Sequence, residues 1–451
     1  MKKILLLSSA LMLAACASTP PQVADLTEMP GSYDHAASVP GAEVEQEWWR
    51  AFGDPDLDTL IAEALAANQD LAAGVARVRQ ARASLSSATA SLLPSISGGA
   101  SASSNSENGF DDFSTSGRLS ASYQLDIFGE TRANRRASKA SYDAQQFDQR
   151  GLELTVQSDV AFTYFSIIAQ RERLDVAKSN LEISERIYNI IEKRYEAGDV
   201  SGFDVASQQA ALANARARIP QIEQQLVSLE TALAVLLGRI PQQYHAPEGN
   251  LLAAVPPAID VGLPSDLLLR RPDLLGAEAS LRAANANVDA ARAAFFPSID
   301  LSSGLSAAPL TGGTSVIGSF AASLAQPVFN GGRLIAGLEG AKAGLDQQIA
   351  RYRQATLNAL RDVEVSLAAL STAEQREAQL QIAKDASEQS LSLAETRYNA
   401  GADDLTSLLN AQSTFFNASD SLVQGRLDRL TAATDLYVAL GGGWSEATPP
   451  Q

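Results

Sequence analysis

Leu92-Leu93-Pro94-Ser95-Ile96 is the stretch where a helical pattern of apolar residues gives way to an alternating one, and it returns as Phe295-Phe296-Pro297-Ser298-Ile299. The offset between the two copies is 203 residues (295 minus 92). Two further pairs of segments keep this offset: Arg194-Tyr195-Glu196-Ala197-Gly198 with Arg397-Tyr398-Asn399-Ala400-Gly401, and Asn68-Gln69-Asp70-Leu71 with Arg271-Pro272-Asp273-Leu274. Three matches at one spacing indicate a duplicated unit, which is longer than the solenoid repeats of about 20–50 residues.

The pattern on either side of Pro94 predicts a helix followed by a β-hairpin. Apolar residues recur at three- and four-residue spacing from Leu57 to Leu85, which indicates a helix. From residue 95 the period is two, and it continues beyond a polar loop at 106–113, so we expect strands over about 94–127 with one apolar and one polar face. The second copy repeats this over about 297–327, with a turn at 309–314. Strands of about ten residues with this alternation are typical of a membrane β-barrel, although a soluble antiparallel sheet shows the same alternation.

Long segments without proline follow each predicted hairpin. No proline occurs between Gly129 and Gly198, or between Gly332 and Gly401. We expect one long helix in each segment, ending at a glycine that allows the chain to reverse. A return helix then completes a helical hairpin, over about 129–237 in the first copy and about 332–440 in the second.

Four predicted strands per chain require an oligomer if they lie in a membrane. Bacterial membrane barrels begin at about eight strands, so four strands cannot close into one. An open sheet in lipid would leave unpaired backbone groups, each costing several kcal/mol. Several chains must then share one barrel: at four strands per chain, two chains would give about 8 strands, three about 12 and four about 16. The strand pattern does not choose among these.

The N-terminus has the pattern of an export signal. Lys2 and Lys3 precede an apolar run over residues 4–15, which is too short for the roughly 20 residues that span a bilayer. The sequence Leu13-Ala14-Ala15-Cys16 resembles the lipobox of bacterial lipoproteins, in which the cysteine receives a diacylglycerol. We therefore expect a signal peptide at 1–15, a lipid on Cys16 and a tether at 16–47. A cysteine that merely follows a signal peptide is the alternative.

The composition excludes several classes of function. The formal net charge is −17, which argues against nucleic acid as a partner and against a basic face for membranes. The chain has two histidines and one cysteine, so it offers very few side chains for a metal site or for histidine-based catalysis. The serines are not accompanied by the partners of a catalytic site. We expect no enzyme activity, no cofactor and no metal.

The order of tether, helix, strand hairpin and helical hairpin, all duplicated, resembles the TolC/OprM family of outer-membrane factors. The lipoprotein branch around OprM, the NodT-type proteins of RND efflux systems, is the nearest match. The resemblance covers about residues 48–444. Its most specific segments are Trp48-Trp49-Arg50-Ala51-Phe52-Gly53-Asp54-Pro55, Leu269-Arg270-Arg271-Pro272-Asp273, Ala293-Ala294-Phe295-Phe296-Pro297-Ser298, Gln326-Pro327-Val328-Phe329 and Ala439-Leu440-Gly441-Gly442-Gly443-Trp444.

This resemblance implies a mainly α fold with a membrane β-barrel. Three chains would form a homotrimer with a 12-stranded barrel and a 12-helix periplasmic tunnel. The structural repeats would be 48–237 and 265–444, joined by an equatorial linker at 238–264 and followed by a tail at 445–451. The protein would be anchored by lipid in the cell outer membrane of a Gram-negative bacterium and extend into the periplasm.

The implied function is a passive exit duct of a tripartite efflux pump. It would conduct drugs or other small molecules that an inner-membrane pump, of RND type, delivers together with a periplasmic adaptor protein. Two alternatives are a duct for type I protein secretion and one for metal efflux. A structural lipoprotein that does not transport is a third, but it leaves the alternating strands unexplained.

The turns between the long and the return helices match the adaptor-docking tips of the family. These turns are Gly198-Asp199-Val200-Ser201 and Gly401-Ala402-Asp403-Asp404. Each glycine also suits the end of a helix, so a role as a helix cap alone is the alternative.

The resemblance also implies a periplasmic gate near these tips. Tyr398 matches the gate tyrosine and Asp204 a gate aspartate, although an acidic residue near a helix N-terminus is favoured by the helix dipole in any case. Ser407 and Asn410 stand where relatives carry aspartates that face the lumen. Asp403-Asp404 would replace them as six carboxylates in three copies, or would form a solvated turn.

Overall fold

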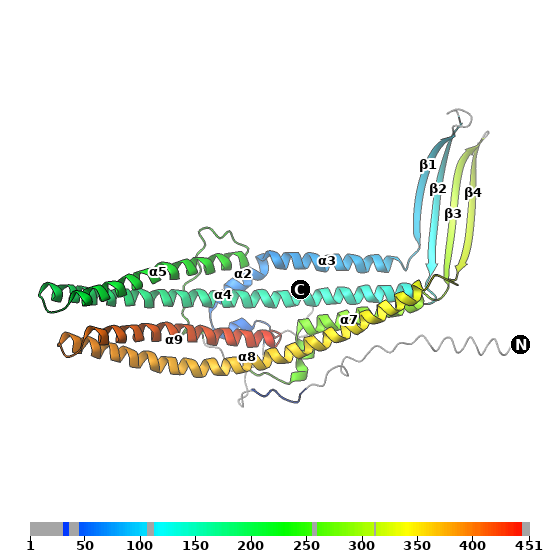
Figure 1. Ribbon diagram of the computed structural model, residues 1–451. Helices are drawn as coiled ribbons and strands as arrows, with labels where there is room; N and C mark the ends of the chain where they lie inside the picture. Colours follow the sequence, from blue (N-terminus) through cyan, green and yellow to red (C-terminus); the bar gives the residue numbers. More distant parts are fainter. Residues whose placement is uncertain (1–29, 36–44, 106–111, 255–258, 311–312, 444–451) are drawn as a thin grey trace. The chain divides into compact units, whose positions relative to one another are not determined.

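The computed structural model describes residues 30–35, 45–105, 112–254, 259–310 and 313–443 (Figure 1). The predicted signal peptide, Cys16 and the tail at 445–451 lie outside the described residues. The described chain forms two compact units. The first contains residues 75–148 and 273–356, and the second contains the rest. The longest helices run through both units, and each unit is taken by itself below.

The first unit contains a four-stranded antiparallel sheet in the order β1-β2-β3-β4. Its strands are β1 (Ser95–Asn105), β2 (Asp112–Leu125), β3 (Ser298–Leu310) and β4 (Gly313–Ala325). The turn expected at 309–314 is shorter than predicted, because the strand ladder continues until Leu310 pairs with Gly313. The loop expected at 106–113 likewise gives way to strand from Asp112.

The register of the sheet separates a polar face from an apolar one. Four pairs of serines face each other between β1 and β2, with Oγ–Oγ distances of 2.7–2.9 Å. On the opposite face Ile96 pairs with Ala121, and Leu119 lies between Gly98 and Leu305. Ile96 and Phe320 on this face are 73% and 75% exposed. An apolar face that is this exposed in a single chain is expected to be covered by lipid or by another protein surface.

The sheet does not close within one chain. In the described residues β1 and β4 each pair with a single neighbouring strand, so both present unpaired backbone groups along one edge. Such edges are normally covered, blunted by charge or paired with another chain. Neither edge strand carries an Asp, Glu, Lys or Arg. The open edges therefore favour pairing with further copies.

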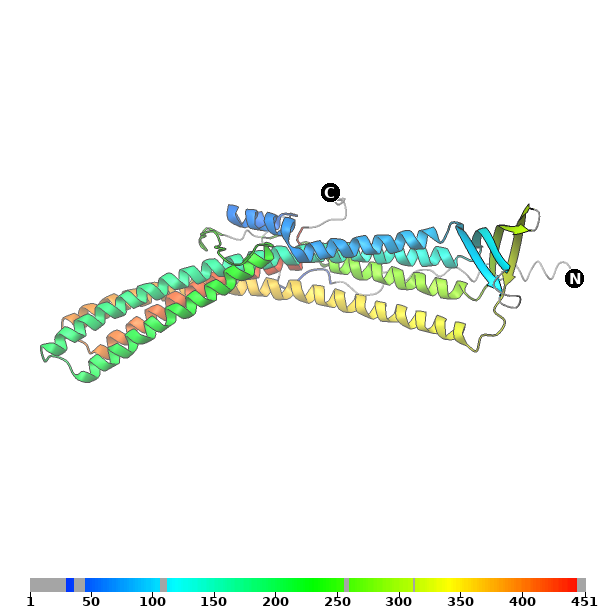
Figure 2. The ribbon, with the colours of Figure 1, turned by 90° about the horizontal axis from the view of Figure 1, so that it is seen from above.

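The helices of the two halves have matching lengths. The long helices α4 (Glu130–Glu196) and α8 (Arg333–Asn399) both have 67 residues, and the return helices α5 (Gly202–Leu236) and α9 (Leu405–Ala439) both have 35. Within the second unit α5 runs back along α4, and α9 along α8 (Figure 2). Two 22-residue helices precede the strands, α3 (Gln69–Ala90) and α7 (Pro272–Ala293).

None of the described helices has the length and hydropathy needed to cross a membrane.

The core of the second unit is built on the segment that begins at Trp48. The 3-10 helix η3 (Trp48–Phe52) buries both tryptophans, and the Trp48 ring stacks on Tyr437 of α9 with centroids 5.4 Å apart. Phe52 packs against Phe165 of α4 at 5.3 Å. Aromatic pairs of this kind add about 0.5–1.5 kcal/mol beyond the burial of their area. The helix α2 (Pro55–Ala67) then starts at the N-cap Asp54.

Equivalent glycines place the ends of the two return helices. Gly238 follows α5 and Gly441 follows α9, and a Cβ on them would lie 2.4 Å from the carbonyl oxygen of Ala67 and 2.6 Å from that of Arg270, respectively. Both pairs keep the offset of 203 residues (441 minus 238, and 270 minus 67). Only glycine allows backbone to approach backbone this closely.

The residue that follows each of these carbonyls in sequence also bonds the end of the return helix through its side chain. Asn68 Nδ2 donates to the carbonyl of Leu236 at 2.9 Å, and Arg271 Nη1 donates to the carbonyl of Ala439 at 3.1 Å. These carbonyls belong to the last turn of a helix, where intrahelical donors run out. The two repeats thus satisfy the same backbone acceptor with different side chains.

Candidate functional site at the helical hairpin tips

The first tip reverses the chain through a glycine with a left-handed backbone. Gly198 has φ +82°, and its N–H donates to the Tyr195 carbonyl at 2.9 Å. The N–H of Asp199 donates to the Arg194 carbonyl at 2.8 Å. These two bonds are the Schellman pattern, which satisfies the last carbonyls of α4 and turns the chain sharply.

The second tip has the same backbone with a different sequence. Gly401 has φ +72°, its N–H donates to the Tyr398 carbonyl at 3.0 Å, and that of Ala402 donates to the Arg397 carbonyl at 2.9 Å. A Cβ on Gly401 would have no other atom within 4 Å. The turn therefore requires glycine for its backbone conformation and not for space.

The two return helices use the same cap with its residues exchanged. At α5, Ser201 is the N-cap, and its N–H and hydroxyl bond the carboxylate of Asp204 at 2.9 and 2.8 Å. At α9, Asp404 is the N-cap and accepts the N–H of Ser407 at 2.9 Å. This bond from Ser407 lowers the pKa of Asp404 below its usual value. The serine at 407 is thus the repeat equivalent of Asp204, with the carboxylate moved to the N-cap.

Asp403 has a partner within its own tip. Arg397 donates to its two carboxylate oxygens at 2.6 and 2.9 Å, and these hydrogen bonds lower the pKa of Asp403. A bidentate pair of this kind fixes orientation as well as charge. The two adjacent carboxylates of the second tip therefore have separate local functions, one as an ion pair and one as a helix cap.

Tyr398 lies buried between the two hairpins. Its side chain is 4% exposed and packs in a cluster with Ile187 and Ile191 of α4 and Leu405 and Leu408 of α9. Its hydroxyl is buried and has no hydrogen-bond partner among the described residues. The repeat equivalent Tyr195 is 51% exposed. One copy of a repeated tyrosine therefore joins the hairpins, and the other faces outward.

Sequence reasoning missed the arginines that connect the hairpins near this tyrosine. The Arg194 guanidinium lies over the Tyr398 ring, 5.0 Å from its centroid. Arg186 Nη2 bonds Glu395 of α8 at 2.7 Å. Arg194 could have been selected because it is the repeat equivalent of Arg397 and precedes a tip, but its partner lies about 200 residues away in the sequence.

The other predicted gate residues do not join this cluster. Ser407 and Asn410 are exposed, and the Asn410 carbonyl accepts the Thr414 hydroxyl at 2.8 Å. Asp204 is held in its capping box. The structure thus brings Arg194 to Tyr398 and Arg397 to Asp403, while Asp204, Ser407 and Asn410 lie apart from both contacts.

Polar side chains continue the contact between hairpins away from the tips. Gln412 of α9 is 5% exposed and donates from Nε2 to Ser184 Oγ at 2.6 Å and to Asn180 Oδ1 at 3.1 Å. Within the first hairpin, Gln208 of α5 donates to the carbonyl of the same Ser184 at 2.9 Å. Buried amides with satisfied donors fix the register of helices that apolar contacts alone would leave free to slide.

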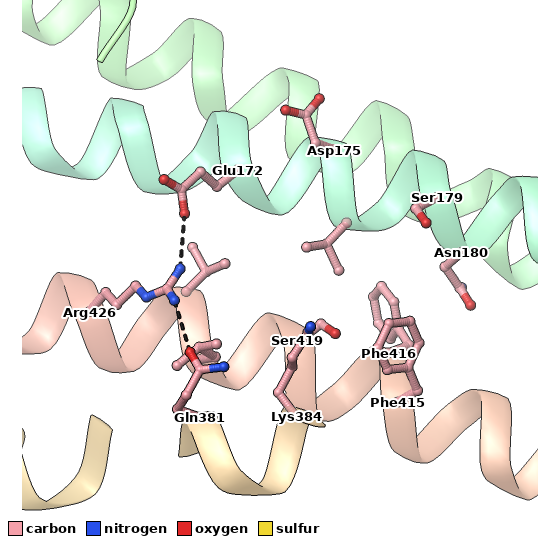
Figure 3. Close-up of a pocket in the computed structure, with 13 residues that line it drawn as sticks. Glu172, Asp175, Ser179, Asn180, Gln381, Lys384, Phe415, Phe416, Ser419 and Arg426 are labelled. Atoms are coloured by element: carbon pink, nitrogen blue, oxygen red, sulfur yellow. Dashed lines mark hydrogen bonds and ion pairs between the residues drawn. The ribbon is translucent and has the colours of Figure 1, made fainter. Parts of the chain in front are cut away.

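Between α4, α8 and α9 the second unit contains a cavity of about 410 Å³ (Figure 3). Arg426 reaches into it, donates to Gln381 Oε1 at 3.1 Å and lies 4.0 Å from a Glu172 oxygen. Glu377 lies 3.7 Å from the same guanidinium. The charged groups here are mutually compensated, which suits a joint between helices.

Comparison with known proteins decides the family. The model of the outer membrane efflux protein family matches the chain twice, at residues 60–239 and 263–442, again offset by 203 (263 minus 60). The chain belongs to this family. Its matched part is well over half of the sequence, and the double match supports the duplicated unit.

Individual relatives match over almost the whole length. The pyoverdine export outer membrane protein OpmQ of Pseudomonas aeruginosa is 37% identical over 98% of this chain and 97% of its own. The cation efflux system protein CusC of Escherichia coli is 33% identical over 88% of both. The solved open state of the Neisseria gonorrhoeae MtrE outer membrane channel superposes with a TM-score of 0.83, at 29% identity, over 96% of this chain and 99% of that one. The chain is an efflux duct of the outer membrane.

Proposed function

We propose that three copies of the chain form one exit duct of a tripartite efflux pump. The carrying observation is the four-stranded sheet with one apolar face, one serine-lined face and two open edges. Three such sheets placed edge to edge make a 12-stranded barrel with lipid on the apolar face and water on the serine face, which pairs every edge. The duplicated hairpins of three chains supply the 12 helices of a periplasmic tunnel.

The tips of the hairpins dock the periplasmic adaptor in this proposal. The turns at 198–201 and 401–404 are exposed except for the partly buried Val200 and Asp403, and they are held by Schellman and N-cap hydrogen bonds, so they present rigid shapes to a partner. The Tyr398 cluster between the hairpins forms the periplasmic gate, with Arg194 on its ring. An RND-type pump in the inner membrane supplies the energy, and the duct conducts passively.

Small molecules are the proposed cargo, and the lipid on Cys16 is the proposed anchor. The names of the relatives include a pyoverdine export protein and a cation efflux protein, so cargo follows the pump more than the duct. Metal efflux and type I protein secretion are the alternative assignments of the same duct. A lipoprotein without transport leaves the family match and the two-faced sheet without a purpose.

Two measurements test this proposal. Light scattering of the purified mature protein, corrected for detergent, should give the mass of three chains, and a monomer would refute the shared barrel. Deleting the gene should raise intracellular accumulation of a fluorescent pump substrate, and plasmid-borne wild-type protein should reverse the change. Unchanged accumulation with a panel of drugs, together with increased sensitivity to transition-metal cations, would move the assignment to metal efflux.

A further inference from the structure

Large apolar side chains gather in the first unit where the strands meet the helices. Five such residues lie in the segments that join β1, β2 or β4 to a helix, at one end of the sheet (Figure 1). They are 44–92% exposed: Leu93, Ile127, Phe128, Val328 and Phe329. Phe128 also stacks on Phe296, with centroids 4.8 Å apart and planes within 10°. We call these five residues the apolar belt; in membrane barrels, large side chains that include aromatic rings gather at the level of the lipid headgroups.

Arginines follow directly behind this belt. Arg132 and Arg136 lie in the first two turns of α4, and Arg292 lies at the end of α7. With Phe128 and Phe296 they line a cavity of about 520 Å³. Their side chains are 58%, 54% and 43% exposed. In a chain of net charge −17 this is a local concentration of positive charge.

Arginines outnumber acidic residues in the lining of the cavity. Asp289 is the one acidic residue in its lining, with Arg136 Nη2 at 3.1 Å and Arg292 Nη1 at 3.8 Å. Arg132 pairs with Asp126 at 2.9 Å, outside the lining. The ion pairs of these three guanidinium groups involve two carboxylates, Asp126 and Asp289, of which only Asp289 lines the cavity.

We propose that this cavity binds the phosphate of an anionic glycerophospholipid in the periplasmic leaflet of the outer membrane. Guanidinium groups bind phosphate oxygens through paired N–H donors. The stacked phenylalanines add an apolar wall against which the glycerol and the first acyl carbons pack. This wall favours a lipid over free phosphate, which has no apolar part. The proposal rests on the membrane location of the strands given above.

Native mass spectrometry of the full-length protein in detergent, with added phosphatidylglycerol, tests the site. Arg136→Gln should reduce retained lipid about tenfold, equivalent to about 1.4 kcal/mol, because a charged donor is lost. Arg135→Gln is the matched control, since it removes the same charge one residue away and does not line the cavity. Arg292→Gln, on the other helix, should reproduce the loss. Circular dichroism verifies that each variant keeps its helices.

Equal lipid retention by the Arg136→Gln and Arg135→Gln variants would overturn the proposal. Displacement of the lipid by millimolar inorganic phosphate would identify an anion site instead. An oligomer that retains no lipid in the wild type would indicate that another copy of the chain covers the cavity. Because the lipid is counted on purified protein, this result is independent of the export assay and of the oligomeric mass that test the proposed function.

Discussion

Replacing Gly441 with alanine should destabilise the protein more than Gly401→Ala does, because Gly441 makes a close backbone contact after α9. Both glycines follow a long or return helix, with φ of +89° and +72°. A left-handed backbone costs an L-residue about 1–2 kcal/mol, so both variants share this loss. A Cβ at Gly441 also meets the Arg270 carbonyl oxygen at 2.6 Å, whereas at Gly401 it meets nothing within 4 Å. Forcing backbone apart in a packed site adds about 1–3 kcal/mol.

The assay is thermal unfolding of the purified protein in detergent, followed by circular dichroism at one fixed scan rate. We expect Gly441→Ala to lower Tm by about twice as much as Gly401→Ala, because it loses about 2–5 kcal/mol against about 1–2. Gly238→Ala should behave like Gly441→Ala, since its Cβ would lie 2.4 Å from the Ala67 carbonyl oxygen. Equal Tm losses at Gly401 and Gly441 would refute the reasoning from close approach.

Three further predictions concern the tips and the N-terminal segment. Gly401→Val, which places a β-branched residue at φ +72°, should leave the oligomer intact and impair export of a fluorescent substrate; full export would contradict the need for a left-handed turn. Arg397→Gln should return the pKa of Asp403 to its usual range, because the Arg397 hydrogen bonds lower it; carbon-detected NMR of labelled aspartate measures this pKa. In the wild type, the Arg397–Asp403 ion pair should be fully formed above the ordinary carboxyl pKa and be lost as pH falls through the lowered pKa of Asp403. Glu364→Gln should expose the segment near His35 to limited proteolysis, because Glu364 accepts the His35 Nδ1 at 2.9 Å. Partial burial raises the pKa of Glu364, but the hydrogen bonds from His35 and from two backbone N–H groups outweigh it, so the wild type should become protease-sensitive only when acid protonates this carboxylate. Equal cleavage of wild type and variant at neutral pH would contradict this contact.

The duplication explains which features of the site could be foreseen. A segment repeated at one offset is expected to repeat its local backbone, and the Schellman turns at Gly198 and Gly401 do so. The exchange of serine and aspartate between Ser201-Asp204 and Asp404-Ser407 follows the same logic, because either residue can cap an N-terminus. The resemblance aligns these positions with the aspartates of relatives and not with the other repeat, so it does not reveal the exchange.

The overall acidic charge gives no information on where single charges gather. A net charge of −17 argues against a basic face for membranes, and it does not reveal that Arg132, Arg136 and Arg292 line one cavity behind the apolar belt, beside Asp289. Two of these arginines are four residues apart on α4, whereas the third comes from α7. Summed charge has no information on which helices meet, so this cavity could only be recognised in the fold.

The sequence by itself determined the helices, the strands with their two faces and the glycine turns. These follow from periods of two and 3.6 residues and from backbone conformations, which depend on neighbours within about four positions. The tertiary structure alone decided which of two equivalent tyrosines is buried, with Tyr398 at 4% exposure and Tyr195 at 51%. It also decided that Arg194 lies over the Tyr398 ring. The two similar segments acquire different surroundings because Tyr398 packs against Ile187 and Ile191 of the other half of the chain, which are far from it in sequence.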